Sequence, residues 1–173
     1  MTILRQIMTL LIVVLLSGCS SVQVNHDYDS NVDFSKYNTY GWLPLPSEAQ
    51  VSQLTLKHIE NAVERELELK GVKAASNNAD MLIALHIGKQ QQIQVVDRGY
   101  RYGRYGRGWG GGTDVYRYEE GTLILDFIDA GTKDLIWRGT ATTVVEPGLD
   151  PDKRREKINK GIKDLLANFP PKK

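Results

Sequence analysis

The chain has 173 residues, of which 41% are hydrophobic and 25% are charged, a balance that indicates one globular domain rather than several. The net charge is +1, and without Arg5 the remaining 21 basic residues equal the 21 acidic residues. This neutrality excludes a global electrostatic attraction to nucleic acid or to anionic lipid.

Residues 1–18 differ from the rest of the chain and are predicted to be a lipoprotein signal peptide. Arg5 supplies a positive charge, and Ile7 to Leu16 form an apolar stretch of about ten residues. Such a stretch is typical of a signal sequence and too short to span a bilayer. The following Leu-Ser-Gly-Cys at residues 16–19 resembles a lipobox, in which the cysteine is acylated and then becomes the N-terminus.

Cys19 is therefore the predicted lipidation site, and residues 19–30 are expected to form the lipidated N-terminus and tether. It is the only cysteine, so the folded part has no thiol for a disulfide or a metal. Several acyl chains such as palmitate on one cysteine would make release from a membrane negligible. Ser20 follows where lipoproteins of the inner membrane usually carry Asp, so we expect an outer-membrane anchor facing the periplasm. The alternative is a stray thiol after an ordinary signal peptide.

Periodicity predicts the first elements of the domain. Val22 and Val24 indicate a short strand, and 37–43 indicates a second one that ends at Pro44. A helix follows, with its apolar residues at helical spacing and Gly71 at the position of a C-terminal cap. The apolar stripe of this helix consists of Leu56, Ile59, Val63 and Leu67.

The second half of the chain is rich in predicted strands. Residues 81–88 alternate between an apolar face and a face of small or polar residues, and a more polar continuation over 90–96 is expected. A hairpin follows around 130–133. Its register stays open: one loop would place Asp126 opposite Trp137, and another, with better matching of the facing side chains, would pair apolar with apolar residues. Its first strand has on one face Leu123, Leu125 and Phe127. Its second strand has on one face Leu135, Trp137 and Ala141.

A last helix is predicted to begin at Asp150-Pro151, where the carboxylate can cap free amides and proline fits the first turn. It ends at Pro170-Pro171 and is basic on one side, which we interpret as a solvated face rather than a binding site. Its apolar stripe consists of Ile158, Ile162, Leu165 and Phe169. The elements together predict an α+β domain over 31–171 in the order strand, strand, helix, four strands, helix.

A loop at 97–113 is rich in glycine, arginine and tyrosine and is expected to be flexible, since it cannot bury enough apolar surface to fold alone. Two functions are open for it, contact with glycan or lipopolysaccharide phosphate and contact with an envelope protein; a tolerated insertion without function is the third possibility. Nucleic acid is not expected as a partner outside the cytoplasm. The candidate interaction residues are Arg98, Tyr100, Arg101, Tyr102, Arg104, Tyr105, Arg107 and Trp109.

No pattern of catalytic residues is present in the sequence, so we expect no enzyme and no metal or other cofactor. The three histidines, His26, His58 and His86, have no metal-ligand spacing. Asp126 and Asp129 lie three residues apart on a strand and should point to opposite faces. They are interpreted as a strand-edge and a turn carboxylate.

The run from Asp33 to Pro44, Asp-Phe-Ser-Lys-Tyr-Asn-Thr-Tyr-Gly-Trp-Leu-Pro, resembles the opening motif of the envelope lipoprotein family called domain of unknown function 4136. Residues 79–86, 121–126 with 135–139, and 169–171 agree with the same family. The resemblance covers about residues 22–171 and implies a single mostly antiparallel sheet with two helices packed on one face. It implies no established activity.

Three hypotheses about function follow from these features. The first is a membrane-anchored binding or accessory module of the cell envelope, which rests on the predicted anchor and on the aromatic residues. The second is a purely structural or stress-related envelope lipoprotein. The third is an enzyme, which would need a pocket with convergent polar groups that the sequence does not show.

Overall fold

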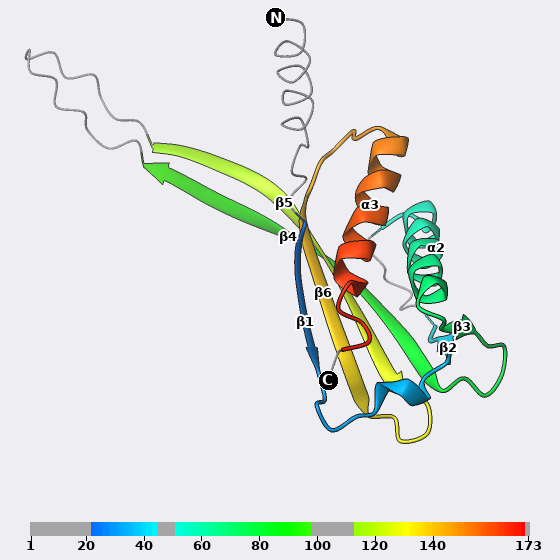
Figure 1. Ribbon diagram of the computed structural model, residues 1–173. Coiled ribbons are helices and arrows are strands. Elements are labelled where there is room, and N and C mark those ends of the chain that lie inside the picture. Colours follow the sequence, from blue (N-terminus) through cyan, green and yellow to red (C-terminus); the bar gives the residue numbers. More distant parts are fainter. Residues whose placement is uncertain (1–21, 45–50, 98–112, 172–173) are drawn as a thin grey trace, which may run out of the picture.

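The computed structural model of the protein describes residues 22–44, 51–97 and 113–171. Two helices lie on one face of a six-stranded sheet, as the resemblance implies (Figure 1). The strands are β1 (Gln23–Tyr28), β2 (Thr39–Trp42), β3 (Lys73–Ala74), β4 (Met81–Asp97), β5 (Thr113–Asp129) and β6 (Leu135–Val145). The helices are the 3-10 helix η1 (Phe34–Lys36) and the α-helices α2 (Gln53–Leu69) and α3 (Pro151–Leu166).

The sheet has the strand order β1-β6-β5-β4-β2-β3 and is mostly antiparallel. The parallel pairs are those of β2 with β4 on one side and with β3 on the other. The element order confirms the predicted α+β succession of strand, strand, helix, four strands, helix. The polar segment 90–96 continues the preceding strand, because β4 runs unbroken over 17 residues.

The start of α3 and the end of α2 confirm the signals in the sequence, whereas α3 ends at Leu166, before the predicted end at Pro170-Pro171. The Asp150 carboxylate accepts hydrogen bonds from the backbone amides of Asp152 and Lys153, and Pro151 occupies the first turn of α3. Gly71 follows α2 with φ +83°, the left-handed conformation that favours glycine at a helix end. Ser52 caps the start of α2 by accepting from the Thr55 amide.

The register of the β5–β6 hairpin is set by a β-bulge. Phe127 pairs with Trp137 and Asp126 with Arg138, but Ile128 pairs with Leu135, so β6 has one extra residue. The prediction that Leu135 shares a face with Trp137 is therefore wrong. Because the bulge inverts the alternation, Leu135 is 46% exposed and Ile136 is buried in its place.

The core lies between the helices and the sheet. Its centre is an aromatic cluster in which the ring centroid of Phe127 lies 4.8 Å from that of Trp137 and 4.5 Å from that of Phe169. Leu67 of α2 and Leu165 of α3 are buried against this layer. The apolar stripes predicted for the two helices thus face the sheet, except that Phe169 reaches the core from the segment after α3. No helix of the described residues covers the opposite face of the sheet.

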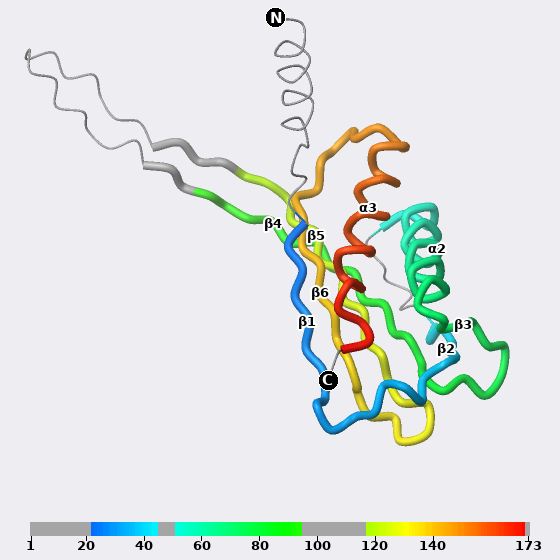
Figure 2. The backbone as a smooth tube through the Cα atoms, in the orientation of Figure 1, coloured from blue at the N-terminus to red at the C-terminus, as the bar shows by residue number. Residues whose placement is uncertain are grey.

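Strands β4 and β5 extend together beyond the helices (Figure 2). They pair as far as Asp97 with Thr113, which are the boundaries expected for the glycine-rich loop. The loop residues 98–112 lie outside the described residues. The end of the body from which this ribbon leaves is also the end at which α2 and α3 begin.

Candidate functional site

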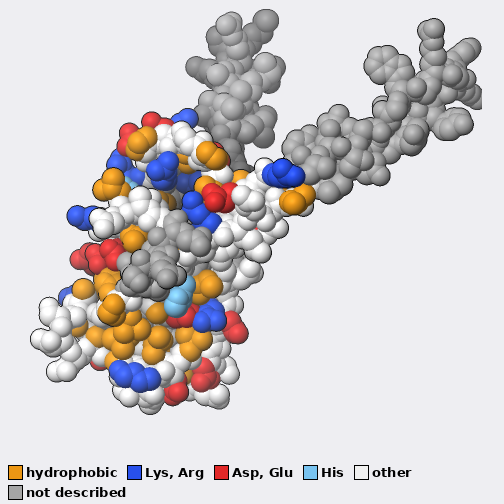
Figure 3. Space-filling view, turned by 180° about the vertical axis from the view of Figure 1, so that it is seen from behind, with side chains coloured by type: hydrophobic (Ala, Val, Ile, Leu, Met, Phe, Trp, Pro, Cys, Tyr) orange, Lys and Arg blue, Asp and Glu red, His pale blue; other side chains and the backbone are white. Residues whose placement is uncertain are grey.

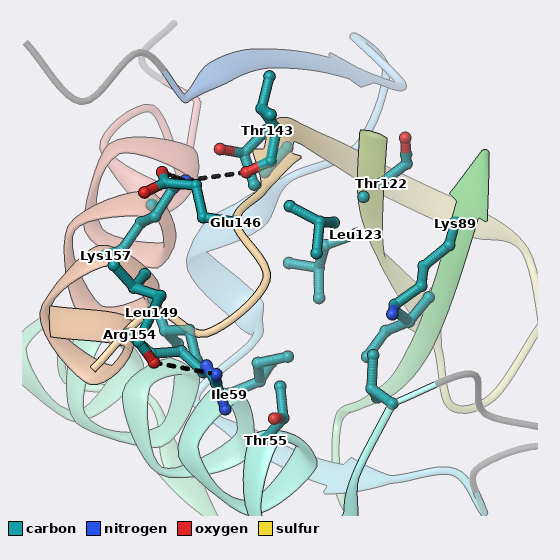
Figure 4. A pocket seen from close by; sticks show the side chains of 18 of the residues that line it. Thr55, Ile59, Lys89, Thr122, Leu123, Thr143, Glu146, Leu149, Arg154 and Lys157 are labelled. Atoms are coloured by element: carbon teal, nitrogen blue, oxygen red, sulfur yellow. Dashed lines mark hydrogen bonds and ion pairs between the residues drawn. The ribbon is translucent and has the colours of Figure 1, made fainter. Parts of the chain in front are cut away.

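A pocket of about 620 Å³ lies at the end of the domain where both α-helices begin (Figure 4). We call it the α2–α3 pocket. Its floor is the helix-facing side of the sheet, with Ile87 from β4, Leu123 from β5 and Ala141 from β6. Its walls are the first turns of α2, including Ile59, and the first half of α3, including Ile158.

The pocket exists because the apolar side chains of the core stop before the sheet ends. Small residues follow on three facing elements, namely Gly121 on β5, Ala141 on β6 and Gly161 on α3. A Cβ atom at Gly161 would only come into ordinary contact with Val22, at 3.6 Å. The elements therefore stay apart at this end without side chains to fill the space between them.

Charged side chains surround the apolar interior. Lys157 of α3 donates to the Glu146 carboxylate at 2.8 Å and to the Val144 carbonyl at 2.9 Å. This ion pair lowers the pKa of Glu146 from its ordinary value of 4.5. Across the pocket, the Lys89 ammonium lies 3.4 Å from the Glu119 carboxylate.

Arg154 is the third basic residue that lines the pocket. Its guanidinium donates to the Leu149 carbonyl at 3.1 Å. Figure 4 shows Arg154 and Lys157 on the α3 side and Lys89 on the opposite side, with Leu123 between them in this view. An apolar interior with polar groups at its margin can enclose an apolar group and leave a polar end near solvent.

A second polar cluster lies on the face of the sheet that the helices leave uncovered. Arg138 donates two hydrogen bonds of 2.6 Å to the Asp126 carboxylate, and His86 Nε2 lies 3.6 Å from the same group. The Asp126 side chain is 7% exposed, whereas those of Arg138 and His86 are 48% and 51% exposed. Hydrogen bonding to Asp126 raises the pKa of Arg138. The nearly buried Asp126 carboxylate is thus paired with the Arg138 guanidinium, which suits a structural role.

Figure 3 shows the surface of the molecule from the side opposite to that of Figure 1. Hydrophobic side chains gather on the lower part of the body, with a histidine and acidic and basic side chains at their margin. Basic side chains gather on the upper part.

None of the predicted site residues is among the described residues that line the α2–α3 pocket. Cys19 and the eight candidate residues from Arg98 to Trp109 are outside the described residues, so their roles stay predictions. The predicted separation of Asp126 and Asp129 is confirmed, and Asp129 accepts from the Tyr37 hydroxyl at the hairpin turn. The interpretation of Asp126 as a strand-edge carboxylate is wrong, because it lies on β5 in the interior of the sheet, on the uncovered face, and is paired with Arg138. Within the described part of the chain, no group of three or more His, Cys, Asp and Glu residues could hold a metal ion.

The α2–α3 pocket was not predicted from the sequence. The residues that line it come from five helices and strands and from the segments that flank them, and they form no motif in the sequence. One signal was present, since Gly121, Ala141 and Gly161 are small residues within segments that are otherwise typical of strands or of a helix. The Asp126–Arg138 pair was missed as well, because it depends on the hairpin register that the sequence left open.

Two solved structures resemble the fold. A PDZ domain protein from Parabacteroides distasonis has a TM-score of 0.60 and 15% identity over 88% of this chain and 36% of its own. The chain thus spans about a third of that protein's length. PelC from Paraburkholderia phytofirmans, solved as a dodecamer, has a TM-score of 0.52 and 12% identity over 88% of this chain and 100% of its own. At these identities the likeness concerns the fold alone.

A family model described as domain of unknown function (DUF4136) matches residues 24–171. The match confirms the family that the aromatic motif at residues 33–44 indicated. No curated protein matches the chain significantly. None of the helices in residues 22–44, 51–97 and 113–171 has the length and apolar character needed to cross a membrane.

Proposed function

The chain belongs to the DUF4136 family, a family of unknown function, and we propose that it is a membrane-anchored, periplasm-facing lipoprotein whose α2–α3 pocket binds the apolar part of an envelope ligand. The observation that carries this proposal is the pocket itself. It combines a volume of about 620 Å³ with a floor and walls built mainly from aliphatic side chains. Pockets for small ligands are typically about 300–1,000 Å³ and predominantly apolar.

The energetics of such a pocket favour a chain-like apolar ligand. Each methylene group removed from water contributes about 0.8 kcal/mol. Eight to ten methylene groups would thus contribute roughly 6–8 kcal/mol before the costs of association are subtracted. The pocket can therefore retain a ligand of this kind through apolar contacts alone.

The predicted anchor lies next to the pocket in the sequence. Val22 lines the pocket and follows Cys19 by three residues. Three residues of fully extended chain span at most about 11 Å. A lipid on Cys19 would therefore hold the pocket close to a membrane surface, where apolar envelope components are concentrated.

Replacing Cys19 by serine tests the anchor. We expect the wild-type chain to incorporate labelled palmitate and to fractionate with the outer membrane, because several acyl chains on one residue prevent release. The Cys19→Ser variant should do neither. A Ser21→Ala variant, altered two residues away, should behave like the wild type. Unchanged fractionation of Cys19→Ser would contradict the membrane anchor.

Filling the pocket tests the binding function. Leu123 lies on the pocket floor, and we expect Leu123→Trp to weaken binding of an uncharged monoacylglycerol at least tenfold, because the indole occupies the ligand's volume. Binding to the full-length protein can be measured by native mass spectrometry after release from a nonionic detergent.

The matched control is Ile124→Trp, which adds a larger side chain to the next residue of the same strand, on the uncovered face. This variant should bind the monoacylglycerol like the wild type. Thermal denaturation of both variants establishes that they fold. Equal binding by a folded Leu123→Trp variant and the wild type would show that the pocket is not the binding site.

A further inference from the structure

The charges that line the α2–α3 pocket are not balanced. Lys89, Arg154 and Lys157 line it together with two acidic residues, Glu119 and Glu146. Each acidic residue is paired with a lysine, Glu119 with Lys89 and Glu146 with Lys157. Among the residues that the structure describes, one positive charge therefore remains at the pocket, although the whole chain is close to neutral.

The remaining charge belongs to Arg154. Its guanidinium donates to a neutral acceptor, the Leu149 carbonyl, and no carboxylate among the described residues pairs with it. The next residue, Arg155, differs in that its guanidinium lies 2.8 Å from the Asp152 carboxylate. A guanidinium has five N–H donors in a planar fork, so Arg154 keeps donors for an anionic partner.

Arg154 also lies beside apolar surface. It shares the pocket with Ile59 and Ile158 from the two helices and with Leu123 from the sheet. Figure 4 shows the Arg154 side chain on the same side of the pocket as the Leu149 carbonyl that it contacts. A ligand that satisfies both features needs an apolar chain and an anionic group at one end.

We infer that the ligand of this pocket is an anionic membrane lipid, with an acyl chain between α2, α3 and the sheet and its phosphate paired with Arg154. This inference rests on the proposed function, because it assigns a ligand class to the same pocket. Guanidinium and phosphate match in geometry and form paired, charge-assisted hydrogen bonds. A bilayer next to the pocket would supply molecules that carry both groups.

The experiment compares two probes with the same acyl chain, lysophosphatidylglycerol, which is anionic, and monoacylglycerol, which is uncharged. Both are added to the full-length protein in nonionic detergent, and binding is measured by native mass spectrometry. We expect the wild type to bind the anionic probe at least tenfold more tightly. Arg154→Gln should remove this preference, so that the variant binds the two probes with similar affinity.

Arg155→Gln is the matched control, since it removes the same charge one residue away, where the guanidinium is already paired. It should keep the preference for the anionic probe. Arg154→Lys keeps the charge but loses the planar fork, and it should bind the anionic probe with intermediate affinity. This second variant keeps the test decisive if Arg154→Gln does not fold.

Each remaining result contradicts a specific part of the inference. Equal affinity of the wild type for the two probes would overturn the assignment of an anionic lipid and leave the apolar pocket as proposed. Displacement of the anionic probe by millimolar inorganic phosphate would overturn the lipid as the source of the phosphate. Absence of binding by either probe would overturn the proposed function as well.

Discussion

Replacing Gly139 by alanine is expected to lower the free energy of unfolding by about 3 kcal/mol, although only one methyl group is added. Gly139 lies on the helix-facing side of β6. A Cβ atom there would lie 2.9 Å from Leu165 Cδ1 and closer still to the Trp137 indole. Such distances force the neighbouring groups to move.

The neighbours of Gly139 cannot move easily. Trp137 is fully buried, and its ring stacks on Phe127 with a centroid distance of 4.8 Å and meets Phe169 edge-on at 5.5 Å. Interiors packed at this density respond to an added methyl group with strain rather than with a small adjustment. The substitution is therefore expected to strain the packing of Trp137 against Phe127 and Phe169.

Urea denaturation followed by circular dichroism measures this effect, with Gly88→Ala as the control. Gly88 lies on β4, and a Cβ atom there would meet nothing within 4 Å. We expect this variant to stay within about 0.5 kcal/mol of the wild type, as substitutions at open positions do. Equal stabilities of the two alanine variants would mean that the aromatic cluster is packed more loosely than the structure describes.

Asp129→Ala is expected to lower the free energy of unfolding by about 3 kcal/mol. The Asp129 carboxylate accepts hydrogen bonds from the Tyr37 hydroxyl at 2.6 Å, the Lys36 ammonium at 3.2 Å and the amides of Gly131 and Thr132 at 2.8 and 2.9 Å. Hydrogen bonds to a charged group contribute about 1.5–3 kcal/mol, and Tyr37 would keep a hydroxyl without its partner. The variant also disconnects η1 from the β5–β6 turn.

Asp134→Ala serves as the control for Asp129→Ala. Asp134 is exposed in the same turn. Its amide donates to the Thr132 hydroxyl and its carbonyl accepts from the Asp129 amide, so these hydrogen bonds use its backbone rather than its carboxylate. We expect a change within about 0.5 kcal/mol. Chemical denaturation at neutral pH compares the two variants, and similar losses in both would contradict the role assigned to the Asp129 carboxylate.

The same contacts predict a dependence of stability on pH. The hydrogen bond from Tyr37, followed by that from the Thr132 amide, lowers the pKa of Asp129 well below its ordinary value of 3.8. A carboxylate with a lowered folded-state pKa stabilises the fold above its unfolded pKa, and this contribution is lost as the pH falls through the folded-state pKa. Below about pH 3.8, the wild type should therefore lose more stability than Asp129→Asn, in unfolding curves measured from pH 6 to pH 2.

The sequence by itself determined the local elements of this protein. The cap formed by Asp150 and Pro151, the left-handed Gly71 and the alternation along residues 81–88 each depend on residues that are neighbours in the chain. Interactions of this range act in the same way wherever the segment is placed in the fold. For this reason the start of α3, the end of α2, the faces of residues 81–88 and the family motif could be predicted.

The tertiary structure decided which faces meet. The bulge between Phe127 and Ile128 buries Ile136 instead of Leu135, and the same register brings Arg138 against Asp126. The α2–α3 pocket likewise needs small residues on three elements to lie opposite one another. Periodicity assigns a side chain to a face but not to a partner on another strand or helix, because the partner depends on packing between distant segments. The candidate site therefore became visible only after these segments were brought together.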